Sequence, residues 1–303
     1  MTKKLTEAID ECLSFIDDAV ELSREIEVEN REPLPSLLEQ CELVSSESVA
    51  EKESIRTFHH FACTGGTLFA KCIASMPNTQ VLSEVEPHSR LVSMDERQFT
   101  PTDLIHLVRA SSRGSTEALE REIFLSGLKV IYDDCSARGL RLVLRDHAHS
   151  KYCTGEEIST YPALHGVVKS RFPTLAVLTV RHPLDSFLSL NRNQWIHFEP
   201  FTLEEYSRRY LAFLEEHDEL PLFRYEDLVS SPEQTISDIC DSLELPYSNE
   251  FLHLLGAIRL SGDSGRSSSK IGKRPRLELP PEIEVQLQQE IPDFNKLTDR
   301  LGY

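Results

Sequence analysis

The sequence lacks any apolar run long enough to cross a membrane. A transmembrane helix needs about 20 predominantly apolar residues in a row. Hydrophobic residues make up 40% of this chain, but charged residues divide them into much shorter runs. The N-terminus carries two lysines and then turns acidic, without the continuous apolar core of a signal peptide. We therefore expect a cytoplasmic protein with no membrane partner.

Cysteine spacing gives no sign of a disulfide framework or a zinc site. The seven cysteines are odd in number, and no two of them have CxxC spacing. We expect reduced thiols, most of them in the core, and no metal ion.

Basic residues are scarce, with 32 Lys and Arg against 50 Asp and Glu and a formal net charge of −18. This balance excludes a general nucleic-acid-binding protein, which needs a basic face. A small anionic ligand requires a local concentration of cations. Residues 265–276, "GRSSSKIGKRPR", provide one, with five of the 32 basic residues in 12 positions.

The chain is expected to consist of an N-terminal helical segment, residues 1–52, and one α/β domain, residues 53–303. Apolar residues between positions 5 and 20 follow one helical face, and acidic residues fill the other. The pattern favours a helix packed on the main domain, because the stripe is short for a coiled coil. The alternative is a dimerisation or partner helix, which leaves a homodimer open.

Alternating strand-like and helix-like segments predict an α/β fold with a mainly parallel five-stranded sheet and helices on both faces. Two of the strand segments are nearly continuous aliphatic runs, as in strands buried on both sides. Ligands bind such sheets where strands end and helices begin. The expected strands are residues 56–63, 79–85, 140–147, 174–182 and 220–228.

No Gly-Lys-Ser/Thr follows the first strand, although a glycine turn leads into a helix there. In "FACTGGTLFAKCIAS", Gly65 and Gly66 let the backbone approach a ligand, and the helix is expected to begin near Thr67. Its N–H groups and positive dipole end suit an anion. We expect this anion to contact Thr64, Gly65, Gly66, Thr67 and Leu68, although such a turn is often only a turn.

A second segment, "VLTVRHPLDSFLSL", places Arg181 at a strand end and Ser189 eight residues later. Pro183 fits the first turn of a helix between them. Arg181 and Ser189 can then hold one phosphate through a charged fork and a hydroxyl.

These two segments, in this order, resemble the sulfotransferases that use 3′-phosphoadenosine 5′-phosphosulfate (PAPS). The resemblance covers roughly residues 56–303 and includes residues 223–246 and the ending "LTDRLGY". It implies a P-loop NTPase-like fold and PAPS as co-substrate without a metal. The 5′-phosphosulfate would lie on the first turn and the 3′-phosphate at Arg181 and Ser189. Residues 265–276 resemble the family's late basic loop, which adds Arg266 and Ser267 to the nucleotide contacts.

The chain departs from the family at Cys63, where Arg or Lys is usual. A thiol is too weak a donor to stabilise the transferred group. The expected substitutes are Arg145, Arg266, Lys270 and Lys71. Lys71 is expected to contribute least, because its place one turn into the helix would point it away.

Two residues fit the role of general base. Glu84 corresponds to the glutamate base of protein-tyrosine sulfotransferases, and Arg145 with His147 resembles the Lys-x-His of cytosolic ones. We place Glu84 first, His147 second and Asp146 third, and each has a structural alternative as an ion-pair or hydrogen-bond partner. Trp195 is a candidate for the acceptor pocket or for packing.

The resemblance thus implies an enzyme, a PAPS-dependent sulfotransferase acting on a hydroxyl or amine. The acceptor is open among small molecules, carbohydrates and peptides. The alternatives are a P-loop-like small-molecule kinase, disfavoured by the absent Gly-Lys-Ser/Thr, and a non-catalytic nucleotide-binding protein.

Overall fold

The computed structural model describes residues 53–89, 91, 102–262, 271–273 and 275–303, together with Ser14 and Ser36. The chain divides into two compact units, Met1–Glu51 and Lys52–Tyr303. The expected N-terminal helical segment lies outside the described residues, as do Arg266, Ser267 and Lys270. Within the described ranges, no helix is long and apolar enough to cross a membrane.

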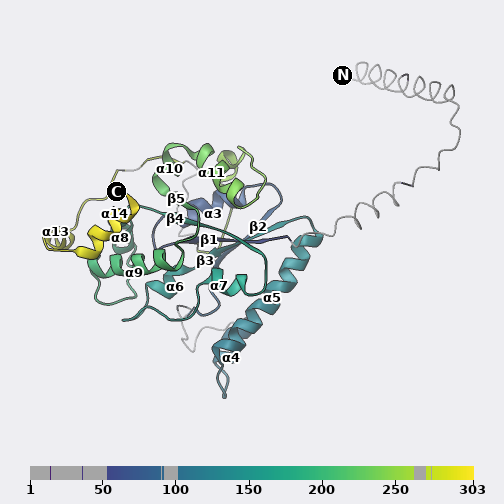
Figure 1. Cartoon of the computed structure of the whole chain (residues 1–303), viewed down its shortest axis with the longest axis horizontal. Helices are drawn as coiled ribbons and strands as arrows, with labels where there is room; N and C mark the ends of the chain where they lie inside the picture. Colours follow the sequence, from purple (N-terminus) through teal and green to yellow (C-terminus); the bar gives the residue numbers. More distant parts are fainter. Residues whose placement is uncertain are drawn as a thin grey trace. The chain divides into compact units, whose positions relative to one another are not determined.

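A five-stranded parallel sheet forms the centre of the unit Lys52–Tyr303 and confirms the predicted fold class (Figure 1). The strand order is β2-β3-β1-β4-β5, so the first strand is central and buried along its whole length. The strands are β1 Ile55–His60, β2 Thr79–Val85, β3 Arg141–Asp146, β4 Thr174–Val180 and β5 Leu222–Arg224.

Helices connect successive strands and continue after the last one. Several begin at expected signals: Pro183 stands in the first turn of α8, and Thr202 caps α9 by accepting from the Glu205 N–H at 3.1 Å. The described helices are α3 Gly66–Ala74, α4 Leu104–Arg109, α5 Glu117–Ala137, α6 Ala148–Tyr152, α7 Leu164–Lys169, α8 Pro183–Asn193, α9 Leu203–Glu216, α10 Tyr225–Ser230, α11 Pro232–Ser242, α12 Phe251–Leu254, α13 Pro281–Leu287 and α14 Pro292–Leu301.

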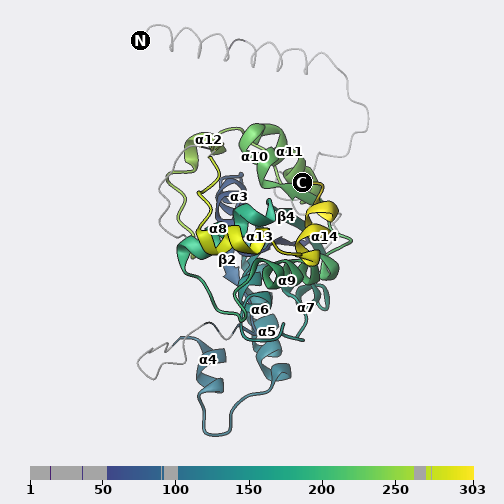
Figure 2. The same cartoon turned by 90° about the vertical axis from the view of Figure 1, so that its left-hand side faces the viewer.

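The helices cover both faces of the sheet. Figures 1 and 2 show α3, α10 and α11 on one side and α5, α6, α7 and α9 on the other. Phe58 of β1 packs against α3 and α11, whereas Leu144 of β3 packs against α5 and α7. A third cluster surrounds Phe61 with residues of α8, α9 and α14. Because neighbouring residues of a strand point to opposite faces, His60 points to the α3 side and His59 to the other side.

The fifth strand is shorter than expected. The sequence predicts a strand over residues 220–228, but β5 ends at Arg224 and a helix begins at Tyr225. β5 is an edge strand that pairs only with the last three residues of β4. Beyond that ladder no strand pairing in the described part of the chain holds it extended, and Glu226 and Asp227 favour the first turn of a helix.

Candidate active site

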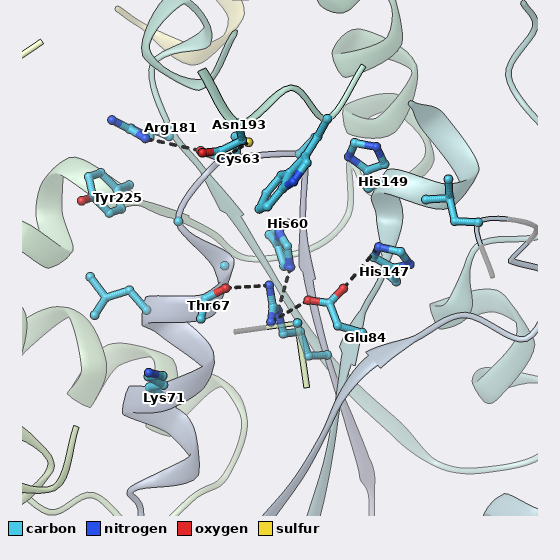
Figure 3. A pocket seen from close by; sticks show the side chains of 18 of the residues that line it. His60, Cys63, Thr67, Lys71, Glu84, His147, His149, Arg181, Asn193 and Tyr225 are labelled. Atoms are coloured by element: carbon cyan, nitrogen blue, oxygen red, sulfur yellow. Dashed lines mark hydrogen bonds and ion pairs between the residues drawn. The ribbon is translucent and has the colours of Figure 1, made fainter. Parts of the chain in front are cut away.

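A cavity of about 480 Å³ lies at the carboxyl edge of the sheet, where α/β proteins of this kind bind ligands (Figure 3). Its walls come from the ends of β1, β2, β3 and β4, from the start of α3 and from the start of α10. The lining residues are His60, Ala62, Cys63, Gly65, Gly66, Thr67, Leu68, Lys71, Glu84, Leu91, Arg145, His147, His149, Arg181, Asn193, Trp195, His197, Tyr225, Gly262 and Gly272.

The turn between β1 and α3 is built for close approach. Gly65 has a φ of 92°, and a Cβ atom there would overlap the ring of Tyr225. The Thr64 hydroxyl closes the turn by donating to a carbonyl three residues earlier, at 2.8 Å. Helix α3 begins at Gly66, one residue before the expected start, and has no acidic residue in its first turn. No acidic side chain in the first turn therefore offsets the positive end of the helix dipole, which faces the cavity, and this suits an anion.

The guanidinium of Arg145 contacts both this turn and Glu84. Arg145 comes from β3 and is only 3% exposed. Its Nη2 donates to Thr67 Oγ1 at 3.1 Å, and its Nη1 lies 2.7 Å from Glu84 Oε1. The structure thus brings one of the four expected substitute cations to the glycine turn.

His60 holds Arg145 in this position. His60 Nδ1 lies 3.1 Å from the Phe61 carbonyl oxygen. A carbonyl can only accept, so Nδ1 carries the proton and Nε2 accepts from Arg145 Nε at 2.9 Å. Burial, with Arg145 adding, lowers the pKa of His60 well below its usual range, which keeps the ring neutral. A Cβ atom at Gly66 would overlap this ring.

Glu84 reaches the cavity because β2 is irregular near its end. The register with β3 shifts within the last four residues of β2, and Glu84 has a φ of 63°. Ser83 and Ser261 exchange two hydrogen bonds, at 2.9 and 2.6 Å, which hold the bulge against the loop before Gly262. Bulges of this kind redirect a side chain, and here the redirected side chain is a carboxylate.

Glu84 and His147 lie close together, and the pKa values of their side chains are shifted toward each other. Their nearest atoms, Oε2 and Nε2, are 3.4 Å apart. Burial raises the pKa of Glu84, Arg145 opposes this shift, and Asp146 adds to it. Burial lowers the pKa of His147. A carboxyl group with a raised pKa beside an imidazole with a lowered one suits proton transfer near neutral pH.

Arg181 lies at the other end of the glycine turn. Its Nη1 is 3.3 Å from Ser189 Oγ and 3.4 Å from the Cys63 carbonyl oxygen, and its Cζ lies 4.7 Å from the centroid of the Tyr225 ring. The two residues that the sequence expects to share one phosphate therefore lie side by side. Ser189 Oγ also donates to the carbonyl of Asp185 at 2.8 Å.

Three side chains differ from their expected placement. Thr64 and Ser189 are buried and are absent from the cavity lining, so the Thr64 hydroxyl supports the turn and Ser189 contacts Arg181 from outside the lining. Lys71 lines the cavity, one turn along α3 from Thr67 (Figure 3), although it was expected to point away.

Another part of the cavity lining consists of Trp195, His149 and His197, which are candidates for contact with an acceptor. Trp195 lines this part and is 38% exposed. His149 Nε2 and His197 Nδ1 are 2.9 Å apart, and burial lowers the pKa of His149 to about 3. This wall therefore combines an indole with a neutral imidazole.

Sequence interpretation missed two residues of the site. They are His60 and Tyr225, which fell inside the expected strands 56–63 and 220–228 and were given no role in the site. No local pattern marks either one: His60 acts through a partner 85 positions away, and Tyr225 through the ring contact with Arg181. A signal for Tyr225 existed in the two acidic residues that follow it, which favour a helix start.

A model of the sulfotransferase family matches residues 61–249 of the chain. The chain belongs to the sulfotransferase family. The matched range contains the glycine turn, Glu84, Arg145 and Arg181, and the activity of the family is transfer of a sulfuryl group. No curated protein matches the chain.

Comparison with solved structures gives further matches, of which the first supports the fold. The sulfotransferase domain from the curacin biosynthetic pathway is 18% identical, with a TM-score of 0.50, over 83% of this chain and 98% of that one. A sulfotransferase domain from the Synechococcus PCC 7002 olefin synthase is 16% identical, with a TM-score of 0.44, over 84% and 97%. A mouse sulfotransferase complexed with PAP is 11% identical, with a TM-score of 0.37, over 83% and 84%.

Proposed function

We propose that this sulfotransferase takes the sulfuryl group from PAPS and passes it to a hydroxyl or amine of its acceptor. The activity would reside in residues 53–303. One observation carries the proposal: Arg145 contacts both Thr67 and Glu84, so a single cation joins the anion-binding turn to a candidate base. That arrangement suits a reaction in which negative charge moves from the acceptor to the departing nucleotide.

The donor would bind along the glycine turn. Its 5′-phosphosulfate would meet the first turn of α3, with Arg145 and Lys71 as the nearby cations. Its 3′-phosphate would meet Arg181, for which Ser189 serves as a support. Arg266 and Ser267 remain proposed contacts of the same nucleotide. None of these contacts calls for a metal ion.

The chemical step is an in-line attack on sulfur. The acceptor oxygen or nitrogen forms a bond to sulfur while the bond from sulfur to the bridging phosphate oxygen breaks. The electron pair leaves with 3′-phosphoadenosine 5′-phosphate (PAP), and the acceptor proton passes to Glu84. Arg145 stabilises the departing oxygen, and His147 is the second candidate for the proton.

Calorimetry tests the donor assignment. PAP should bind at micromolar concentration or tighter, equally well with and without magnesium, and ATP should bind more weakly. Binding that needs magnesium and prefers ATP would support a kinase instead. Failure of both ligands to bind would favour a non-catalytic protein.

A screen of hydroxyl- and amine-bearing acceptors with radiolabelled PAPS tests the transfer itself. Small molecules, carbohydrates and peptides each belong in the screen. The control is an Arg145→Ala enzyme, which should transfer little label to any acceptor that the wild-type enzyme modifies.

A further inference from the structure

Three buried side chains converge on the face of the sheet opposite the glycine turn. They are His59 of β1, Asp146 at the end of β3, and His217, which follows α9 directly. They are 0%, 1% and 3% exposed. One ligand atom from each lies within 4.8 Å of the other two. Two imidazoles and a carboxylate form a common donor set for transition-metal ions.

Each imidazole has one ring nitrogen anchored on an oxygen. His217 Nδ1 donates to the carbonyl of Phe213 at 2.8 Å, and His59 Nε2 lies 2.9 Å from Thr57 Oγ1. The other nitrogen of His59, Nδ1, lies 2.8 Å from Asp146 Oδ2. Metal-binding histidines are oriented in this way, with the non-coordinating nitrogen held by an oxygen acceptor.

Two atoms of the cluster have no hydrogen-bond partner within the described part of the chain. They are His217 Nε2 and Asp146 Oδ1, and both are buried. Buried polar atoms in native proteins almost always have a partner. With Nδ1 of His217 bound to a carbonyl, Nε2 presents a lone pair, which is the form that coordinates a metal.

We propose that His59, Asp146 and His217 bind one divalent first-row transition-metal ion, of which zinc is the probe to use. The three side chains are buried on the face of the sheet opposite the glycine turn, so the ion would have a structural role. It would fix the end of β3, from which Arg145 and His147 enter the active site. A buried water bonded to His217 Nε2 and Asp146 Oδ1 is the competing occupant.

Metal analysis of the purified full chain tests the proposal. After dialysis against a chelator and reloading with zinc, we expect roughly one zinc ion per chain and a higher melting temperature than for the chelated protein. His217→Gln should abolish this binding, whereas substitution of the exposed His253 should leave it unchanged. Less than about a tenth of an ion per chain, or equal binding by wild type and His217→Gln, would overturn the proposal in favour of water.

An isosteric pair of variants guards against loss of folding. Thr57→Val removes the anchor of His59 in β1 and should weaken zinc binding about tenfold or more. Thr179→Val is its control, because Thr179 pairs with His60 in register and points to the opposite face. Equal zinc affinities of these two variants would also overturn the site. None of these measurements depends on PAPS or on an acceptor.

Discussion

Arg145 pairs with Glu84 in the structure, and in the proposed reaction its charge would also act on the phosphosulfate. In the structure it pairs with Glu84 at 2.7 Å while donating to Thr67 at 3.1 Å. A bound phosphosulfate would compete for the same guanidinium, and the carboxylate would then lose part of its counter-charge. The proposed substitute for the cation that is usual at the Cys63 position would thus be coupled directly to Glu84, the proposed base.

Substitution of Arg145 tests this replacement. Arg145→Ala should lower kcat by about 10²–10³, because it removes a preorganised cation from the developing charge. Arg145→Lys, which keeps the charge but loses the fork, should fall between that variant and wild type. Steady-state rates at saturating PAPS give the comparison. Arg138→Ala, at an exposed arginine paired with Asp134, is the control. A fall of less than tenfold for Arg145→Ala would assign the cation to another residue.

The pH dependence of the rate tests Glu84 as the base. Burial raises the pKa of this carboxyl group, and the ionised form is the one that accepts a proton. The rate should therefore be full above that raised pKa and fall tenfold per pH unit below it, at a higher pH than for an ordinary glutamate.

Glu84→Gln should lower kcat by about 10²–10⁴ and remove this limb of the profile. His147→Asn should keep the limb and lower the rate less. The reverse ranking would make His147 the base. No tenfold loss in either variant would point to a water-mediated route, because the Asp146 carboxylate is buried against His59.

Arg181→Ala should weaken PAP binding by about 2–4 kcal/mol, since it removes a charged contact to a phosphate. Ser189→Ala should cost only about 1 kcal/mol or less, because that hydroxyl hydrogen is already donated to Asp185 at 2.8 Å. Calorimetry with PAP measures both. Adenosine 5′-phosphosulfate, which lacks the 3′-phosphate, is the matched ligand and should lose little affinity in either variant. Equal losses for the two ligands would move both residues away from the 3′-phosphate.

At the level of the elements, sequence interpretation succeeded where the determinant is local. Aliphatic runs ending in polar residues located all five strands, and Pro183 marked the start of α8. Sequence interpretation was incomplete where the local structure depends on contacts with a segment far away in the sequence. The bulge that aims Glu84 depends on Ser261, 178 positions from Ser83. The length of β5 depends on pairing with β4 alone.

The start of α3 is a second case: the reason for a glycine at position 66 is a contact between His60 and a residue far away in the sequence. Gly66 was expected to serve the ligand, yet a side chain there would overlap the ring of His60. That ring in turn accepts from Arg145 at 2.9 Å. The glycine therefore makes room for the contact that orients Arg145, the proposed substitute cation.

Gly66→Ala should consequently impair donor binding through His60. The added Cβ must displace the ring, which costs about 1–3 kcal/mol and disturbs Arg145. Gly127→Ala is the matched control, because Gly127 lies in α5 with open space around it. That variant should be more stable by about 0.5–1 kcal/mol and bind PAP normally. Thermal unfolding and calorimetry on both proteins measure the two effects. Unchanged PAP affinity in Gly66→Ala would separate the glycine from the site.

At the level of the whole molecule, the net negative charge of the protein repels the proposed anionic donor. The formal net charge is −18, and the proposed donor is a multiply charged anion. The favourable charges are local: Lys71, Arg145, Arg181 and the positive end of α3 gather at one cavity. Salt decides how strongly the net charge and the local cations each act on the ligand. The Debye length falls from about 30 Å at 0.01 M salt to about 8 Å at 0.15 M.

The association rate of PAP should therefore rise as salt is added to a dilute buffer. At about 10 mM salt the approaching anion interacts with the whole acidic protein, whereas at about 150 mM only the local cations act on it. We expect an increase of several-fold over this range. Trp195, the only tryptophan, lines the cavity and provides the fluorescence signal for stopped-flow measurements. Adenosine, which is uncharged, is the control and should show no dependence on salt. A PAP association rate that falls steadily with salt would mean that the field of the cavity outweighs the net charge even at long range.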